Sequence, residues 1–299
     1  MLNTTKMRLN TSDKIFYFLD YTLLIFTGLI ILLPLLNVFS QALSDPQSVL
    51  MGRVRFWPVN FTLDTIILIL RNPNISTAYF NTFFYAIVGT IINLAMTVMC
   101  AYPLSRQNFT GRNFFMLFFT FTMMFGGGMI PTYILIRNLG LIDTRWVMLL
   151  PGAMAVWNMI LARTFFQNTI PKEMYESAEL DGASHIKTLL GIVLPLSTPI
   201  LAVLTLFYAV SHWNSYFDAM LYLRSQKLFN IQLMLRNAIS NMNTLLNQSD
   251  NITDLEKSMA YAEASKYALI VVSMVPVLII YPFVQRHFIK GIMIGAIKG

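Results

Sequence analysis

The chain has 299 residues, of which 56% are hydrophobic and only 12% are charged, and its mean hydropathy is +0.60. This composition is too apolar for an ordinary soluble domain and predicts a protein embedded in lipid. The net charge of +7 does not indicate nucleic-acid binding, because the basic residues are scattered near loop ends and are not grouped with aromatic side chains. The single cysteine, Cys100, excludes an intrachain disulfide and a cysteine metal cluster.

Six apolar segments have the character of membrane-spanning helices. Most of them reach the roughly 20 residues needed to cross about 30 Å of hydrocarbon, and the shortest, the fourth, is uncharged. The predicted spans cover residues 16–39, 80–101, 114–136, 146–162, 189–213 and 267–285. We therefore predict an all-α integral membrane protein with six transmembrane helices and with both termini on one side of the membrane.

The first span follows Lys6, Arg8 and Lys14, as the apolar core of a signal peptide follows its basic segment. Its apolar run is much longer than the core of a signal peptide, so we predict a retained anchor. Lys and Arg residues are almost equally numerous on the two sides of the six predicted spans. The positive-inside rule therefore does not determine the orientation, which requires a motif.

Glycines and prolines interrupt several of the predicted spans. The third contains Gly126 to Gly128 and Pro131, the fourth contains Pro151, and the fifth contains Pro195 and Pro199. Membrane helices tolerate such residues where neighbouring groups satisfy the freed backbone carbonyls. The sequence is compatible both with fixed kinks at close helix contacts and with hinges or a translocation path.

The polar segment between the fourth and fifth spans, residues 171–183, has the features of a helix start. It opens with a proline, which suits the first helical position, and two early glutamates favour the positive end of the helix. At helical spacing Ala178 and Gly182 share one face, which would let another surface approach the backbone closely. The Asp181-Gly182 pair then predicts a turn.

The order Glu176-Ser177-Ala178, three residues, Gly182, nine residues and then Ile-x-Leu-Pro195 resembles the EAA loop of ABC importer permeases. Ser177 replaces the commonest second residue of that motif. In that family the loop forms a short coupling helix that sits in a groove of a cytoplasmic ATPase. The resemblance therefore implies that the loop 163–190 faces the cytoplasm. The coupling residues that it implies are Glu176, Ser177, Ala178, Asp181, Gly182 and Ala183.

The resemblance extends from NTFFYAIVGT at Asn81, through MIPTYILIRNLGLIDTRWVMLLPG, to the ending QRHFIKGIMIGAIKG. The chain most resembles the carbohydrate-uptake permeases of the maltose type. Within that family, the segment 126–133 is similar to the subgroup that handles large oligosaccharides. It implies the type I ABC importer permease fold. The implied divisions are a cytoplasmic segment 1–15, a permease domain 16–288 with an outer loop 214–266, and a cytoplasmic tail 289–299.

The resemblance also implies an assembly in the cytoplasmic membrane of a bacterium. Its members are a second homologous permease, two copies of a cytoplasmic ATPase that hold ATP and Mg²⁺, and an extracytoplasmic solute-binding protein, with membrane lipid and a carbohydrate substrate as further partners. The sequence lacks a G-x-x-x-x-G-K-[ST] loop, paired histidines of a zinc site and a G-x-S-x-G elbow. We expect a subunit with no catalytic residues, no metal and no cofactor of its own.

Aromatic and amide side chains suited to a sugar path occur in the fourth span and at the end of the fifth. Pyranose rings present apolar C–H faces and hydroxyl groups, which these side chains complement. The candidates are Trp157, Asn158, Trp213, Asn214 and Tyr216. Tryptophan and tyrosine also collect at lipid headgroups, so an interfacial role is the alternative.

Other functions make different demands on the sequence. An ion-coupled secondary transporter needs ionisable groups within its spans, and Asp20 alone qualifies. A membrane enzyme needs a nucleophile or metal constellation, which the motifs do not supply. An ABC importer of amino acids, peptides or phosphate would share the coupling loop, and only the maltose-type segments favour sugar.

Overall fold

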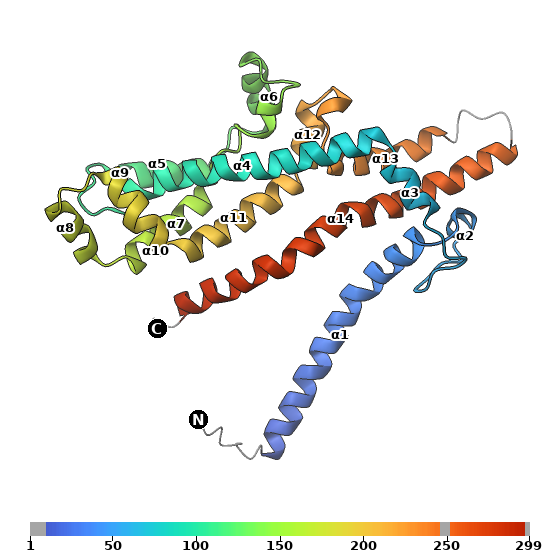
Figure 1. Ribbon diagram of the computed structural model, residues 1–299, viewed down its shortest axis with the longest axis horizontal. Helices are drawn as coiled ribbons and strands as arrows, with labels where there is room; N and C mark the ends of the chain where they lie inside the picture. The colour runs from blue at the N-terminus through green and yellow to red at the C-terminus, as the bar shows by residue number, and fades with distance from the viewer. Residues whose placement is uncertain (1–9, 246–251, 297–299) are drawn as a thin grey trace. The chain divides into compact units, whose positions relative to one another are not determined.

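The computed structural model describes residues 10–245 and 252–296, with side chains described within 10–238 and 256–279 (Figure 1). Over these residues the chain is helical and contains no strand, which confirms the all-α prediction. The contacts divide the chain into two compact units. One comprises residues 1–69 and 238–272, and the other comprises residues 70–237 and 273–299.

The first unit begins with α1 (Thr11–Ala42), a helix of 32 residues whose most apolar window has no buried side chain. Asn10 caps it by accepting a hydrogen bond from the Thr11 N–H at 2.7 Å, and the Asp13 carboxylate accepts a hydrogen bond from the Asn10 N–H at 3.0 Å. This helix is long enough and apolar enough to span a bilayer.

The chain that follows α1 folds back on the end of that helix through α2 (Pro46–Leu50) and the loop before α3 (Asp64–Leu70). The Asn37 amide donates to the Arg55 carbonyl, and the Ser40 hydroxyl donates to the Phe56 carbonyl, each at 2.7 Å. A small apolar cluster of Val49, Val54 and Ala264 joins to this unit the part of α14 (Ile252–Ala296) that ends at Val272. The polar end of α1 is therefore held by backbone carbonyls rather than by ion pairs.

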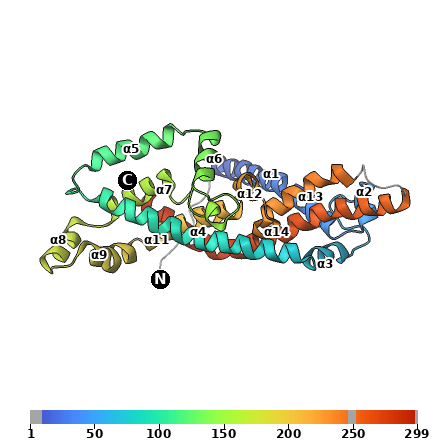
Figure 2. The same cartoon turned by 90° about the horizontal axis from the view of Figure 1, so that it is seen from above.

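The second unit is organised around α4 (Pro73–Ser105), a helix of 33 residues that is about 50 Å long at 1.5 Å per residue. Asn72 accepts a hydrogen bond from the Asn74 N–H at 3.0 Å and so caps its first turn. Helices α7 (Val156–Thr169) and α11 (Thr198–Trp213) pack along α4 (Figures 1 and 2). Most of the apolar core of this unit lies between these three helices.

Polar side chains on the buried face of α4 satisfy backbone groups of neighbouring segments. The Asn93 amide donates to the Gly152 carbonyl at 2.5 Å, and its oxygen lies 2.7 Å from His212 Nε2. Tyr208 of α11 accepts a hydrogen bond from the Ala155 N–H at 3.2 Å. In lipid each of these backbone groups would otherwise be without a partner, so the three helices are held together by obligatory bonds.

The predicted fourth span, 146–162, is α-helical only from Val156 onward. A short 3₁₀ helix, η1 (Arg145–Met148), and turns precede α7, whose 14 residues extend about 21 Å. Val147, Met148 and Leu149 are buried in the protein. Irregular backbone at membrane depth is tolerated where protein covers it, which explains why this segment lacks a full helix.

The third and fifth predicted spans are bent. The third consists of α5 (Arg112–Met124) and α6 (Met129–Asn138), which meet at 110° across the glycine segment, where Gly128 has a φ of +86°. The fifth consists of a helical stretch, His185–Leu196, and α11, which meet at 83° at Ser197 between two prolines. The stretch comprises α9 (His185–Thr188), the π-helix η2 (Leu189–Val193) and α10 (Leu194–Leu196).

Three described helical segments have the length and composition of straight spans: α1, α4 and residues 256–279 of α14. Each bent pair adds one more segment of suitable total length and composition. Glycine and proline therefore mark the places where the spans of the second unit change direction.

The N-terminal part of α4 forms hydrogen bonds with the chain that follows α11. This chain forms α12 (Tyr216–Tyr222), η3 (Gln226–Leu228) and α13 (Ile231–Leu245). Asn81 donates to the carbonyls of Lys227 at 2.8 Å and Phe229 at 3.1 Å, and the Tyr85 hydroxyl donates to the Leu228 carbonyl at 2.9 Å.

Asp143 completes this arrangement, which we call the α4 clasp and define by Asn81, Tyr85 and Asp143. The Asp143 carboxylate accepts the backbone N–H groups of Arg224 and Ser225, each at 2.9 Å, and the Ser225 hydroxyl at 2.6 Å. These hydrogen bonds, of which that from the Ser225 side chain is the strongest, hold the pKa of Asp143 below its usual value. The clasp thus fixes residues 224–229, and Leu228 and Phe229 of this segment also pack against the buried apolar cluster that contains Tyr85.

The contact between Gly89 of α4 and His212 of α11 predicts that adding one methyl group at residue 89 lowers the stability of the protein. A Cβ atom at Gly89 would overlap the His212 imidazole, whereas a Cβ atom at Gly191 would meet open space. We expect Gly89→Ala to destabilise the detergent-purified protein by about 1–3 kcal/mol through overpacking. Thermal melting should show a lower Tm for Gly89→Ala than for Gly191→Ala, and the difference should shrink when His212→Ala is added. Equal melting of the two glycine variants would contradict this contact.

The α4 clasp predicts a pH-dependent stability difference between the wild type and Asp143→Asn. Asn tolerates the positive φ of 58° at this position, so the substitution tests the charge. Because the folded-state pKa is lowered, the contribution of the carboxylate is complete above its ordinary pKa of about 3.9 and is lost as pH falls through the lowered value. The wild type should melt higher than the variant at neutral pH and converge with it below about pH 3.9. A constant difference across this range would show that the carboxylate charge is not responsible.

Candidate coupling site and translocation residues

The segment 171–183 forms α8 (Lys172–Leu180), with Pro171 as its N-cap residue and Asp181 as its C-cap residue. The Gly182 N–H donates to the Glu179 carbonyl at 3.1 Å, and the Ala183 N–H donates to the Ala178 carbonyl at 2.9 Å. This pair of bonds is the Schellman motif, in which the residue after the cap adopts the left-handed conformation. Gly182 has a φ of +69°, so the glycine of the motif is required by the helix end.

The structure exposes most of the residues that the sequence assigned to coupling, with one difference. Glu176, Ser177, Asp181 and Gly182 are exposed and Ala183 is half-buried, but Ala178 is only 5% exposed. The expectation that Ala178 and Gly182 together present a bare face is therefore not met. Ala178 faces the body of its own chain.

Two large apolar side chains beside the motif are exposed instead. Leu180 at the end of α8 is 90% exposed, and Ile186, just beyond it, is 70% exposed. Carboxylates from Glu176 and Asp181 lie in the same short segment. The free surface of α8 thus combines acidic groups with an apolar tip.

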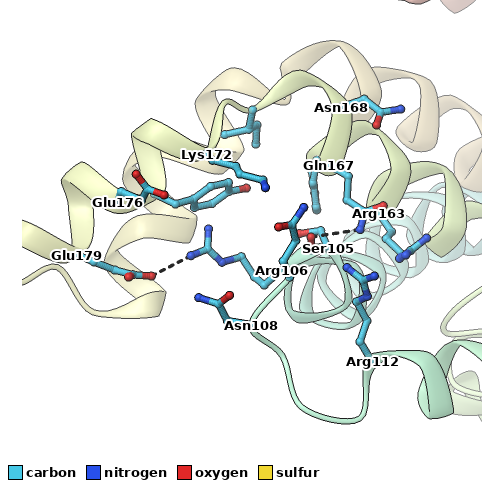
Figure 3. Close-up of a pocket in the computed structure, with 14 residues that line it drawn as sticks. Ser105, Arg106, Asn108, Arg112, Arg163, Gln167, Asn168, Lys172, Glu176 and Glu179 are labelled. Carbon is cyan, nitrogen blue, oxygen red and sulfur yellow. Dashed lines mark hydrogen bonds and ion pairs between the residues drawn. The ribbon is translucent and has the colours of Figure 1, made fainter.

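Arg106 ties α8 to the end of α4. Its guanidinium lies 2.9 Å from the Glu179 carboxylate and 3.7 Å from the centroid of the Tyr175 ring (Figure 3). Tyr175 is buried in the core cluster that includes Phe166 and Val193. Burial raises the pKa of Tyr175, and the Arg106 charge acts in the opposite direction. A single arginine therefore joins an ion pair on the surface to a ring in the core.

A polar pocket of about 440 Å³ separates α8 from the ends of α4, α5 and α7. Arg163 of α7 donates from Nε to the Leu104 carbonyl at 3.0 Å, and Gln167 donates to the Ser105 carbonyl at 3.3 Å, so α7 caps the end of α4. Figure 3 shows arginines from three chain segments directed into this pocket. The pocket is lined by cationic, acidic and amide side chains.

The candidates for a sugar path fall into two separate groups. Trp157 and Asn158 open α7, near the level of Asn93, and Trp157 is 58% exposed whereas Asn158 is buried. The second group lies at the far end of α11, where Trp213 is buried against Phe83 with ring centroids 5.3 Å apart. Phe83 and Asn93 are ten positions apart along α4, which is about 15 Å of rise.

The three residues of the second group, Trp213, Asn214 and Tyr216, make different contacts. Asn214 donates to the Val210 carbonyl of its own helix at 2.9 Å, and the exposed Tyr216 ring contacts Phe217. Trp213 is therefore part of the α4–α11 packing, and Asn214 caps the end of α11. Trp157 and Tyr216 are the members of the predicted set that present aromatic surface outward.

Several residues of this region carry no signal in the sequence. Arg106 follows the second span as an ordinary basic flank, and nothing local reveals its pairing with a glutamate 73 positions away. Tyr175 lies inside the predicted coupling helix, but its burial depends on the neighbouring helices. Asn93 and His212 occupy predicted spans, where polar residues in apolar runs are the available signal for buried hydrogen bonds.

Comparisons with known proteins agree with this architecture. Residues 6–294 match the family described as binding-protein-dependent transport system inner membrane component. The chain is 36% identical over 287 residues to the polygalacturonan/rhamnogalacturonan transport system permease protein YtcP of Bacillus subtilis, covering 96% of this chain and 99% of that protein. It is 25% identical over 312 residues to the maltodextrin transport system permease protein MalD of Streptococcus pneumoniae, covering all of both chains.

A solved structure shares the fold. It is a chain of a bacterial ABC transporter involved in the import of the acidic polysaccharide alginate, with a TM-score of 0.85 and 35% sequence identity. The match covers 94% of this chain and 99% of that chain. The predicted importer-permease fold is thereby confirmed.

The contacts of Arg106 with Glu179 and Tyr175 predict an effect on the local stability of α8. Removing the Arg106 side chain deletes a partly exposed ion pair and a cation–π contact, which together contribute about 1 kcal/mol. We expect Arg106→Ala to speed hydrogen exchange of the 172–183 amides by about fivefold, as that free energy implies. Hydrogen-exchange mass spectrometry measures this, with Arg137→Ala on α6 as the matched control. Unchanged exchange in Arg106→Ala would show that α8 is held by its apolar contacts alone.

Proposed function

Since this chain belongs to the family of binding-protein-dependent transport system inner membrane components, we propose that it is one of two permease subunits of an ABC importer for an oligosaccharide. Its partners in this proposal are a second homologous permease, two cytoplasmic ATPase subunits and an extracytoplasmic solute-binding protein. The chain itself has no catalytic role, because hydrolysis takes place on the ATPase subunits, where ATP and Mg²⁺ bind.

The observation that carries the proposal is the construction of α8. Its Schellman end at Gly182, its exposed Leu180 and its acidic surface form a short projecting helix, while Arg106 and Tyr175 fix its other side to the core. A helix that is free on one face and anchored on the other transmits a displacement from a bound partner to the spans. This supports the role of the coupling residues Glu176, Ser177, Asp181, Gly182 and Ala183.

The orientation follows from the same role. If α8 meets a cytoplasmic ATPase, then the end of α4 at Ser105 is cytoplasmic and the α4 clasp is on the outer side. Ser105 and Asn81 are 24 positions apart on α4, which is about 36 Å of helix and matches the thickness of the hydrocarbon core plus its boundaries. Six spans then place both termini in the cytoplasm.

Transport in this proposal is a shift between two populations of the membrane part. ATP binding favours the closed arrangement of the ATPase pair, and α8 transmits that preference to α4 through Arg106 and Tyr175. The size of the shift is limited by the difference between the affinities of ATP for the two arrangements of the ATPase pair. The spans are bent at Gly128 and Ser197. In this proposal these two bends are the hinges of the movement.

The proposed cargo is a carbohydrate. The relatives compared above are named for polygalacturonan/rhamnogalacturonan and maltodextrin transport, and the solved structure is named for import of an acidic polysaccharide. Exposed aromatic rings at Trp157 and Tyr216 are suited to the apolar faces of sugars. Acidic as well as neutral oligosaccharides therefore belong in the first substrate screen.

Affinity purification of the tagged chain from its native membrane tests the assembly. Mass spectrometry of the purified material should identify a second permease and a P-loop ATPase. Purification of this chain alone in several mild detergents would overturn the proposal and favour a secondary transporter.

Substitutions at Gly182 test the coupling role in that purified complex. The left-handed conformation there costs a β-branched residue roughly 1–2 kcal/mol but is accessible to Asn. We expect Gly182→Val to abolish the link between ATP hydrolysis and sugar uptake in vesicles, while Gly182→Asn largely retains it. Gly191→Val, at an open helical site, is the control. Normal coupled uptake by Gly182→Val would refute the assignment.

A further inference from the structure

The pocket beneath α8 collects positive charge where two apolar helices end. Arg106 follows the last residue of α4, Arg112 is the first residue of α5, and Arg163 projects from α7. Lys172 at the start of α8 contributes a fourth cation to the lining. Figure 3 shows the Arg112 and Arg163 side chains approaching one another at the side of the pocket away from Glu179.

The pocket lining contains four cationic side chains but only two carboxylates. Glu179 pairs with Arg106 at 2.9 Å, and Glu176 is the other carboxylate in the lining. Within the part of the chain whose side chains are described, neither Arg112, Arg163 nor Lys172 forms an ion pair. Arg163 has one hydrogen bond, from Nε to the Leu104 carbonyl, which leaves the outer edge of its guanidinium available.

The Arg112 charge disfavours the charge of Arg163. Burial lowers the pKa of Arg163, and the neighbouring Arg112 charge lowers it further. Arginine remains protonated at physiological pH, so this repulsion persists in the folded protein. An anion placed between the two guanidinium groups would relieve it.

The donors around the pocket match the oxygens of a phosphate group. Guanidinium groups bind phosphate through paired N–H bonds, and Asn108 and Gln107 add neutral amide donors to the lining. We propose that Arg112 and Arg163 bind a phosphate-type anion in this pocket, on the side opposite the Arg106–Glu179 pair. The bound anion would join α5 to α7.

A phospholipid headgroup and a free phosphate share this chemistry. The pocket lies at the ends of apolar helices, where basic sites between membrane helices meet anionic headgroups. A soluble phosphate compound would reach the same donors from the aqueous side, because Lys172 and Asn108 are exposed. The cytoplasmic leaflet is the expected source of lipid under the proposed orientation, but the binding itself does not depend on that orientation.

The test uses the full-length purified chain after removal of lipid. Native mass spectrometry would measure binding of phosphatidylglycerol and of phosphatidylcholine with identical acyl chains, and equilibrium dialysis would measure binding of radiolabelled inorganic phosphate. The variant is Arg112→Gln, which removes no hydrogen bond within the described chain. The matched control is Arg137→Gln, an exposed arginine at the end of α6 outside the pocket.

Loss of a charge-assisted bond should weaken anion binding by about tenfold in Arg112→Gln and leave it unchanged in Arg137→Gln. Selective binding of phosphatidylglycerol that Arg112→Gln weakens identifies a headgroup as the source. Saturable binding of inorganic phosphate that the same variant weakens identifies a free phosphate. Binding of neither anion, or equal weakening in the two variants, would overturn the proposal.

Discussion

The packing of α4 against α7 and α11 is the constraint on which the rest of the second unit depends. A helix with polar residues on its buried face is stable in lipid only if those residues find partners, and Asn93 does so by binding the Gly152 carbonyl and His212. These bonds in turn allow the irregular chain before α7 to lie at membrane depth. Gly89 lets the His212 ring approach closely enough to take part.

This packed core has a fixed attachment at each end. Arg106 and Tyr175 join it to α8, and the α4 clasp joins it to the chain after α11. The Arg106 attachment contributes only about 1 kcal/mol, because a partly exposed ion pair is worth about 1 kcal/mol or less. The clasp is the stronger attachment, because the Asp143 carboxylate accepts three hydrogen bonds and the segment also packs against a buried apolar cluster. Both attachments link their segments to the packed core.

Much of the architecture was predictable from the sequence, and the failures have physical reasons. The family, the all-α fold and the helix at 171–183 were correctly predicted because long apolar runs and the EAA spacing are local patterns. The bends within the third and fifth predicted spans occur at Gly128, which has a φ of +86°, and at Ser197 between two prolines, but the residue types alone do not give the angles of 110° and 83°. The burial of Ala178 and the Arg106–Glu179 pair depend on contacts between segments that are far apart in the sequence. A local sequence pattern does not contain such contacts. The roles of Trp157 and Tyr216 remain predictions.

If both attachments are rigid, α8 and the α4 clasp move as one body. Spin labels at Ser177 on α8 and Gln226 beside the clasp, in a Cys100→Ala background, would report their separation by pulsed electron paramagnetic resonance in the assembled importer. Rigid transmission through α4 predicts the same distance with and without ATP trapped on the ATPase subunits. A change in that distance on ATP trapping would contradict rigid transmission through α4.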